Sequence, residues 1–176
     1  NIYCAAMALI NSVLLITYSW NLKRVIFVGH IIISYLVAST FLFGALIVLG
    51  EGNLWVVIIM AALAFFANLS REVIKTIEDI PGDRMAGMKT LPMIVGERRA
   101  RDIASIFLVI SIVLAPLPFL LNILNIYYIV VVSFGILLFI FSIIWNQRET
   151  PPEKVHNLMK IAMLVCLIAF LVGAAL

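Results

Sequence analysis

The sequence predicts an all-α protein, a polytopic bundle of six membrane-spanning helices. Hydrophobic residues make up 65% of its 176 residues and charged residues only 12%, whereas soluble domains are about half apolar and about a quarter charged. Apolar blocks alternate with short polar breaks, and each block has roughly the 20 residues that a helix needs to cross a bilayer. The alternation over about ten residues that marks the strands of a membrane β-barrel is absent.

Six apolar blocks follow one another along the chain. They are predicted to span Ile2–Trp20, Val25–Leu49, Asn53–Glu78, Ile103–Leu121, Ile126–Trp145 and Leu158–Leu176. The polar breaks fall at 21–24, 50–53, 79–102, 122–125 and 146–157, and the last is marked as a loop by Pro151 and Pro152. Pro116 and Pro118 are expected to kink the fourth span.

The basic residues are confined to one side of this predicted bundle. All twelve lie in or beside the first, third and fifth breaks: Lys23, Arg24, Arg71, Lys75, Arg84, Lys89, Arg98, Arg99, Arg101, Arg148, Lys154 and Lys160. The other side carries Glu51 as its only charge. The positive-inside rule therefore predicts an integral membrane protein whose basic side is cytoplasmic. The clean split also supports the count of six spans, since a missed span would scatter the charges over both sides.

Several classes of function are disfavoured. No basic patch has the interleaved aromatic residues of a nucleic-acid site. Cys4 and Cys166 lie within apolar segments and are interpreted as packing residues. His30 lies in the second span, and a polar contact with a neighbouring helix is favoured over a ligand or proton role. A transporter or channel segment would need ionisable groups near the bilayer midplane, which these spans nearly lack.

One segment concentrates charge of both signs. "REVIKTIEDIPGDRMAGMKTLP", residues 71–92, holds four of the nine acidic and four of the twelve basic residues. Asn68, Glu72, Lys75 and Asp79 are spaced by four, three and four, so they share one face of the third helix. Charged side chains at the end of an apolar membrane helix cost free energy unless they are paired or have a function.

Asp79 and Asp83 are four residues apart, but Pro81 and Gly82 stand between them. Proline disfavours helix at the preceding residue, so we expect the helix to end near Asp79 and a turn to bring Asp83 back beside it. Carboxylates mixed with basic residues favour Mg²⁺ held together with a di- or triphosphate. A purely acidic cluster would indicate Ca²⁺ and a purely basic one a lipid headgroup. A solvated loop with internally paired charges, in a purely structural bundle, stays an alternative.

The segment "REVIKTIEDIPGDRMAGMKTLPMIVG" resembles the second aspartate-rich region of the UbiA family of intramembrane prenyltransferases, and most closely that of its archaeal ether-lipid branch. "YSWNLKRVIFVGH" is similar, more weakly, to the family's fourth-helix region, with its Lys-Arg pair. The resemblance implies that the chain is one transmembrane prenyltransferase domain, residues 1–176, corresponding to spans four to nine of a nine-helix fold. It places the cytoplasmic active-site segment at 71–102 and implies that an N-terminal part of the same protein is missing.

The resemblance implies a mechanism and assigns roles. The family transfers a prenyl group from a polyprenyl diphosphate to an acceptor, with Mg²⁺ holding the diphosphate and the prenyl tail in an apolar channel. Asp79 and Asp83 would bind Mg²⁺, and Glu72 would bind it or support the network around it. The implied diphosphate contacts are Lys23, Arg71, Lys75 and Lys89. Mg²⁺ and the basic residues would stabilise the departing diphosphate while an allylic carbocation develops.

The chain also departs from the family's pattern. Thr76 stands where the archaeal branch usually has Asp, Pro81 where Glu is frequent, and His30 where Asn is common. The family's first motif, NDxxDxxxD, is not in these 176 residues. We therefore expect the chain alone to be inactive, with half an active site.

The sequence leaves two classes of acceptor open. Within the prenyltransferase hypothesis, geranylgeranyl transfer to the lipid acceptor geranylgeranylglyceryl phosphate is favoured. An aromatic acceptor, such as a quinone, haem or chlorophyll precursor, is the alternative.

Overall fold

The computed structural model describes residues 1–20, 25–48 and 53–175. Within this part all regular secondary structure is helical: α1 (Ile2–Trp20), α2 (Val28–Val48), α3 (Leu54–Glu78), α4 (Ile80–Met85), α5 (Leu91–Val95), α6 (Glu97–Leu114), α7 (Leu117–Leu120), α8 (Ile126–Gln147) and α9 (Pro152–Ala175). Six of these are long and apolar enough to cross a membrane, with α6 and α7 counted as one span. The predicted all-α bundle of six spans is confirmed.

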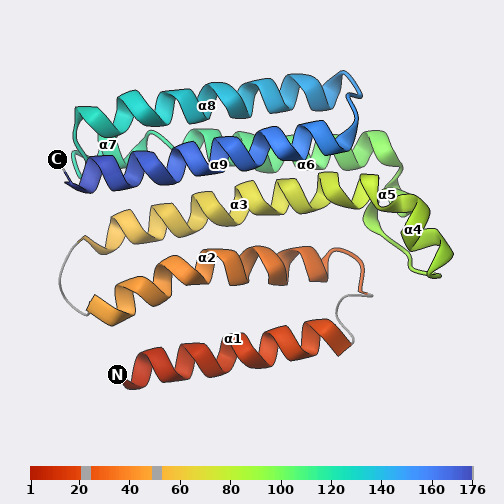
Figure 1. Ribbon diagram of the computed structural model, residues 1–176, viewed down its shortest axis with the longest axis horizontal. Coiled ribbons are helices and arrows are strands. Elements are labelled where there is room, and N and C mark those ends of the chain that lie inside the picture. Colours follow the sequence, from red (N-terminus) through yellow and green to blue (C-terminus); the bar gives the residue numbers. More distant parts are fainter. Residues whose placement is uncertain (21–24, 49–52, 176) are drawn as a thin grey trace.

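The six long helices lie side by side, and α3 is at the centre (Figure 1). It packs against α2, α6 and α9, while α8 packs most extensively against α9, and α1 lies at the edge against α2. Both termini lie at one end of the bundle (Figure 1). The short helices α4 and α5 lie at the opposite end, which also carries the described basic residues and is called the basic end below.

Two predicted span boundaries were wrong. The fourth span begins at Glu97, six residues before the predicted Ile103, and the sixth begins at Pro152 instead of Leu158. In both cases the first helical turns are charged, so the apolar window begins later than the helix itself. Pro152 begins α9 because proline is well suited to the first helical position, where its missing N–H costs nothing.

The prolines of the fourth span interrupt it, as expected. α6 ends at Leu114 and α7 begins at Leu117, with Pro116 between them. The carbonyl of Ala115 accepts a hydrogen bond from the buried hydroxyl of Tyr128 in α8. This bond satisfies a buried backbone acceptor at the point where the helix is interrupted.

α8 and α9 approach closely because Gly135 has no side chain. A Cβ atom at Gly135 would lie 2.6 Å from the Sγ atom of Cys166. Cys166 is buried and unbonded to another cysteine, as its predicted packing role requires. Small residues commonly allow such approaches between membrane helices.

A buried arginine ties α6 to the end of α8. Arg101 donates to the side-chain and backbone oxygens of Asn146 and to the carbonyl of Thr150, at 3.2–3.3 Å. Asn146 in turn donates to the Arg101 carbonyl at 2.8 Å. At the basic end, a polar network therefore holds α6 to α8.

Candidate active site

A polar cavity of about 270 Å³ opens at the basic end of the bundle. It is bounded by the end of α1, the start of α2, the last two turns of α3, and the segment containing α4 and α5. Its lining is Tyr18, Val25, Ile26, Phe27, Gly29, His30, Glu72, Lys75, Thr76, Asp79, Asp83, Met88, Lys89, Thr90 and Leu91. The cavity thus brings together five of the predicted site residues: Glu72, Lys75, Asp79, Asp83 and Lys89.

The amphipathic end of α3 positions the first three of these. Val73, Ile74 and Ile77 face the core and are buried. Lys75 and Asp79, on other sides of the same turns, are exposed toward the cavity. The predicted polar stripe of the third helix is therefore present, and three of its members line one cavity.

Asp79 marks the junction of two helices, as Pro81 and Gly82 indicated. α3 ends at Glu78, Asp79 caps it with φ −79° and ψ −5°, and α4 begins at Ile80. The N–H of Asp83 donates to the Asp79 carbonyl at 2.9 Å. Asp83 therefore returns beside Asp79 by way of a short helix, and both line the cavity.

Arg71 is oriented by its neighbours and is not among the lining residues. Its Nη1 atom donates to Glu72 Oε1 at 2.5 Å and to Asn68 Oδ1 at 3.3 Å. Asn68 is buried and donates to Ser34 in α2 at 3.2 Å. A polar chain thus runs from α2 through Asn68 and Arg71 to Glu72 at the cavity wall.

Two of the departures from the family's pattern contact each other. The Nε2 atom of His30 lies 2.5 Å from the Oγ1 atom of Thr76. This is the interhelical polar contact predicted for His30. The ring of His30 also stacks on Phe27, with centroids 6.0 Å apart. Phe27 has φ +66°, a conformation that non-glycine residues adopt at a cost and that is frequent at functional sites.

One buried polar atom in the cavity wall, the Oγ1 atom of Thr90, has no hydrogen-bond partner among the described residues. Buried polar groups in native proteins are normally paired. The Thr90 hydroxyl is therefore suited to a ligand that brings its own acceptor, such as a phosphate oxygen.

The remaining site predictions have different outcomes. Lys23 lies outside the described residues. His30, Thr76 and Thr90 line the cavity although they had no predicted catalytic role. Thr90 could have been identified because it follows Lys89 within the quoted segment. His30 and Thr76 are 46 residues apart in the sequence, and no local pattern indicates that they meet.

The carboxylates of the cavity are suited to a metal ion that a bound substrate also coordinates. The described residues contain no group of three or more His, Cys, Asp or Glu side chains that could hold a metal alone. Mg²⁺ usually binds through one or two carboxylates together with substrate phosphates and water. Asp79 and Asp83, with Lys75 and Lys89 in the same cavity, therefore have the right chemistry for a Mg²⁺–diphosphate.

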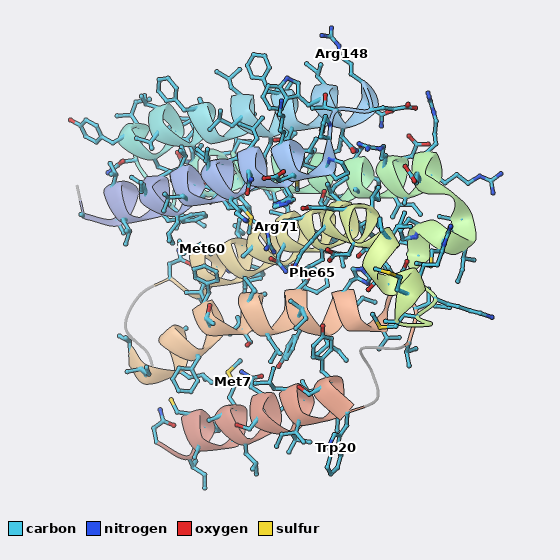
Figure 2. The ribbon with its side chains drawn as sticks, turned by 45° about the vertical axis from the view of Figure 1, so that its right-hand side comes forward. Met7, Trp20, Met60, Phe65, Arg71 and Arg148 are labelled. Carbon is cyan, nitrogen blue, oxygen red and sulfur yellow. The ribbon has the colours of Figure 1, made fainter. Side chains whose placement is uncertain are left out.

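An apolar groove of about 190 Å³ lies deeper in the bundle, between α2, α3 and α9. Its lining is Val37, Phe41, Met60, Leu63, Ala64, Met163, Leu164, Cys166, Leu167 and Phe170. Met60, Ala64, Asn68, Arg71 and Lys75 are spaced by four, four, three and four and so follow one face of α3. Figure 2 shows Met60 and Arg71 on α3, where it passes between α2 and α9. One face of α3 thus leads from the groove toward the polar cavity.

The fold and the cavity define a multi-pass helical membrane protein with a mixed acidic and basic site at one end of the bundle. The family model of the UbiA prenyltransferase family matches residues 1–173. The chain belongs to this family, which confirms the resemblance found in the charged segment.

Relatives with a curated description cover nearly the whole chain. It is 39% identical over 173 residues to "Digeranylgeranylglyceryl phosphate synthase" of Methanosarcina mazei, covering 98% of this chain and 60% of the relative. It is 38% identical over 174 residues to the protein of that name from Methanococcoides burtonii, covering 99% of this chain and 62% of the relative. The chain therefore spans about three-fifths of the length of these relatives.

A solved structure is also similar to the chain. It is described as "Structural and mechanistic insights into the biosynthesis of Digeranylgeranylglyceryl phosphate synthase in membranes". The TM-score is 0.89 at 32% sequence identity, and the match covers 99% of this chain and 62% of the solved one.

Proposed function

We propose that the protein containing this chain transfers a geranylgeranyl group from its diphosphate to geranylgeranylglyceryl phosphate, in the synthesis of membrane ether lipids. The observation that carries the proposal is the polar cavity, in which carboxylates and lysines meet at the end of an otherwise apolar bundle. The relatives named for this product support the choice of substrates. The basic end faces the cytoplasm in this proposal, in keeping with the positive-inside rule.

Asp79 and Asp83 are the proposed Mg²⁺ ligands, and Glu72 supports them. The carboxylate of Glu72 is engaged with Arg71, so its main role is to complete the network beside the metal. Bound Mg²⁺ would neutralise the diphosphate and make it a better leaving group. The hard oxygen donors of the three side chains suit this ion.

The basic side chains hold the diphosphate in this proposal. Lys75 and Lys89 line the cavity and carry point charges suited to phosphate oxygens. Arg71 bonds Asn68 and Glu72 and does not line the cavity, so its proposed contact with the diphosphate rests on the family resemblance. Lys23 has the same proposed role on the strength of the family resemblance alone.

The apolar groove takes the prenyl tail. A tail extending from the cavity along the α3 face meets Ala64 and Met60, whose neighbours in the groove are apolar. Burial of such a chain is favourable at about 25 cal/mol per Å² of apolar surface. Tail binding thus orients the reacting carbon toward the acceptor at the basic end.

The test is a transfer assay on the full-length protein with labelled geranylgeranyl diphosphate, with and without Mg²⁺. We expect labelled product with geranylgeranylglyceryl phosphate, and no product after chelation of Mg²⁺. Transfer to an aromatic acceptor in place of the lipid would contradict the proposed acceptor. Transfer that is unaffected by chelation would contradict the proposed metal.

A further inference from the structure

The last turn of α3 is contacted from two sides by the chain's two histidines. His30, in the first turn of α2, meets Thr76 at 2.5 Å. His156, in the first turns of α9, meets Glu78 Oε2 at 2.9 Å through its Nε2 atom. The two contacts come from different helices, and both fall within three residues of Asp79.

The direction of the first contact follows from the hydroxyl of Thr76. This hydroxyl has a single proton, and it is placed to donate to the Glu72 carbonyl at 2.8 Å. With the Thr76 hydroxyl donating to Glu72, the tautomer of His30 that completes the contact is the one in which Nε2 donates to Thr76 Oγ1. The contact therefore fixes both the ring of His30 and the rotamer of Thr76, one turn from Glu72.

In the second contact, between His156 and Glu78, only the histidine is buried. His156 is 7% exposed as a residue, whereas the Glu78 side chain is 38% exposed. The Nδ1 atom of His156 is buried and has no hydrogen-bond partner among the described residues. An apolar pair would join α9 to α3 without leaving such an atom unpaired, so stability alone does not account for His156.

This turn needs support because the helix does not continue through it. α3 ends at Glu78, and the following α4 has six residues and contains Pro81 and Gly82. At about 100° per residue, Thr76 lies about 60° to one side of Asp79 and Glu78 about 100° to the other. The histidines therefore hold the turn on both flanks of the residue that faces the cavity.

We propose that His30 and His156 are positioning residues that fix the rotation of the last turn of α3, and with it the direction of Asp79. The proposal rests on the proposed function, because Asp79 is taken as a Mg²⁺ ligand. Neither imidazole needs to touch the metal. Groups that hydrogen-bond to a metal ligand commonly affect metal affinity by 10- to 100-fold when they are removed, and these less direct contacts should cost on the order of the lower end of that range.

The first test uses the full-length protein and the His156–Glu78 contact. Mn²⁺, observed by EPR, replaces Mg²⁺, and inorganic pyrophosphate replaces the diphosphate of the donor. His156→Ala should weaken Mn²⁺ binding on the order of tenfold, and His156→Gln, whose amide can still donate to Glu78, should restore most of it. Lys160→Ala is the matched control, since Lys160 lies one turn further along α9, is exposed and bonds Asn157.

The His30–Thr76 contact is tested at the Thr76 hydroxyl, because removing the His30 ring would also remove its stacking on Phe27 in the cavity wall. Thr76→Val removes the hydroxyl and should weaken Mn²⁺ binding in the same way, while Thr76→Ser should retain it. Hydrogen–deuterium exchange without metal provides an independent measurement. Amides at the end of α3 should exchange faster in His156→Ala and Thr76→Val than in the wild type, and at normal rates in the Gln and Ser variants.

The outcomes separate this proposal from the proposed function. Faster exchange with unchanged Mn²⁺ affinity would make the contacts purely structural and would overturn the positioning role. Unchanged exchange and unchanged affinity in a folded His156→Ala protein would overturn it as well. A wild-type protein that binds no Mn²⁺ with pyrophosphate would instead overturn the proposed function, and the exchange data would still report whether the histidines hold the turn.

Discussion

At the scale of single residues, acidic side chains close together in the sequence differ in exposure and in partners. Asp79 and Asp83 differ in exposure, Asp79 being exposed and Asp83 half-buried, but they line the same cavity across one helix junction. Arg71 and Glu72 are adjacent in sequence and form an ion pair in which both side chains are about one-fifth exposed, 21% and 20%. Of the four acidic residues of the segment, Glu72 is paired with Arg71 and Glu78 with His156, whereas Asp79 and Asp83 line the cavity beside each other.

The first prediction concerns Asp79 and Asp83. Asp79→Asn and Asp83→Asn keep the shape of each side chain and remove its charge, so each should lower prenyl transfer by roughly 100-fold or more if Mg²⁺ and the leaving group depend on it. The measurement is the initial rate with labelled donor at saturating Mg²⁺.

Asp102→Asn is the matched control. Asp102 is exposed at the same end of the bundle and contacts Gln147, so its rate should stay near that of the wild type. Wild-type rates in both Asp79→Asn and Asp83→Asn would show that the site is wrongly assigned.

At the scale of elements, α3 is the helix on which the site depends. Its core face carries Val73, Ile74 and Ile77, and its other faces carry the cavity residues and the groove. α8 and α9 form a tight pair beside it, and α9 contacts α3 directly. The position of α9, and so of His156, depends on how closely α8 and α9 pack.

The second prediction tests this pair of helices. Gly135→Ala places a Cβ atom 2.6 Å from Cys166 Sγ, which should cost about 1–3 kcal/mol of stability by overpacking. Gly44→Ala is the control, because nothing lies within 4 Å of a Cβ atom there. Thermal unfolding in detergent should show a lower Tm for Gly135→Ala and no loss for Gly44→Ala. An equal Tm in both variants would mean that α8 and α9 are not tightly packed at this point.

At the scale of the whole molecule, composition and charge were enough to predict the bundle. Hydropathy located six spans, and the confinement of basic residues to alternate breaks supported that count and predicted the direction of each span. Hydropathy misplaced the starts of the two helices that begin with charged turns, at Glu97 and Pro152. A hydropathy window detects apolar residues and not the backbone hydrogen bonds that define a helix. The charged segment predicted five of the cavity residues, since they are local to α3, α4 and α5.

The rest of the site depends on contacts between distant parts of the chain. His156 and Glu78 are 78 residues apart, and only the packing of α9 on α3 brings them together. Arg71 was expected at the diphosphate from its place in the motif, but its orientation is set by Asn68 and Glu72. Which of several possible partners a side chain contacts depends on tertiary structure and cannot be predicted from the spacing of residues in the sequence.

The third prediction concerns orientation in the membrane. Single cysteines at Asn122 and Arg148, in a protein whose Cys4 and Cys166 are replaced by Ala, should be labelled differently in intact cells by a membrane-impermeant thiol reagent. If the basic end is cytoplasmic, the cysteine at 122 should react and the one at 148 should react only after lysis. The reverse pattern would place the cavity outside the cytoplasm.

The last prediction concerns how much of the catalytic site these residues supply. The described residues hold no group of three or more metal-ligating side chains, and the chain spans about three-fifths of the relatives' length. Two carboxylates can share Mg²⁺ with a diphosphate, but the NDxxDxxxD motif, which the family resemblance implies also binds Mg²⁺, is not in these 176 residues. Residues 1–176 produced alone should therefore give no transfer, while Mn²⁺ with pyrophosphate should still bind weakly. Transfer by residues 1–176 at the rate of the full-length protein would contradict this and would mean that the cavity described here is a complete active site.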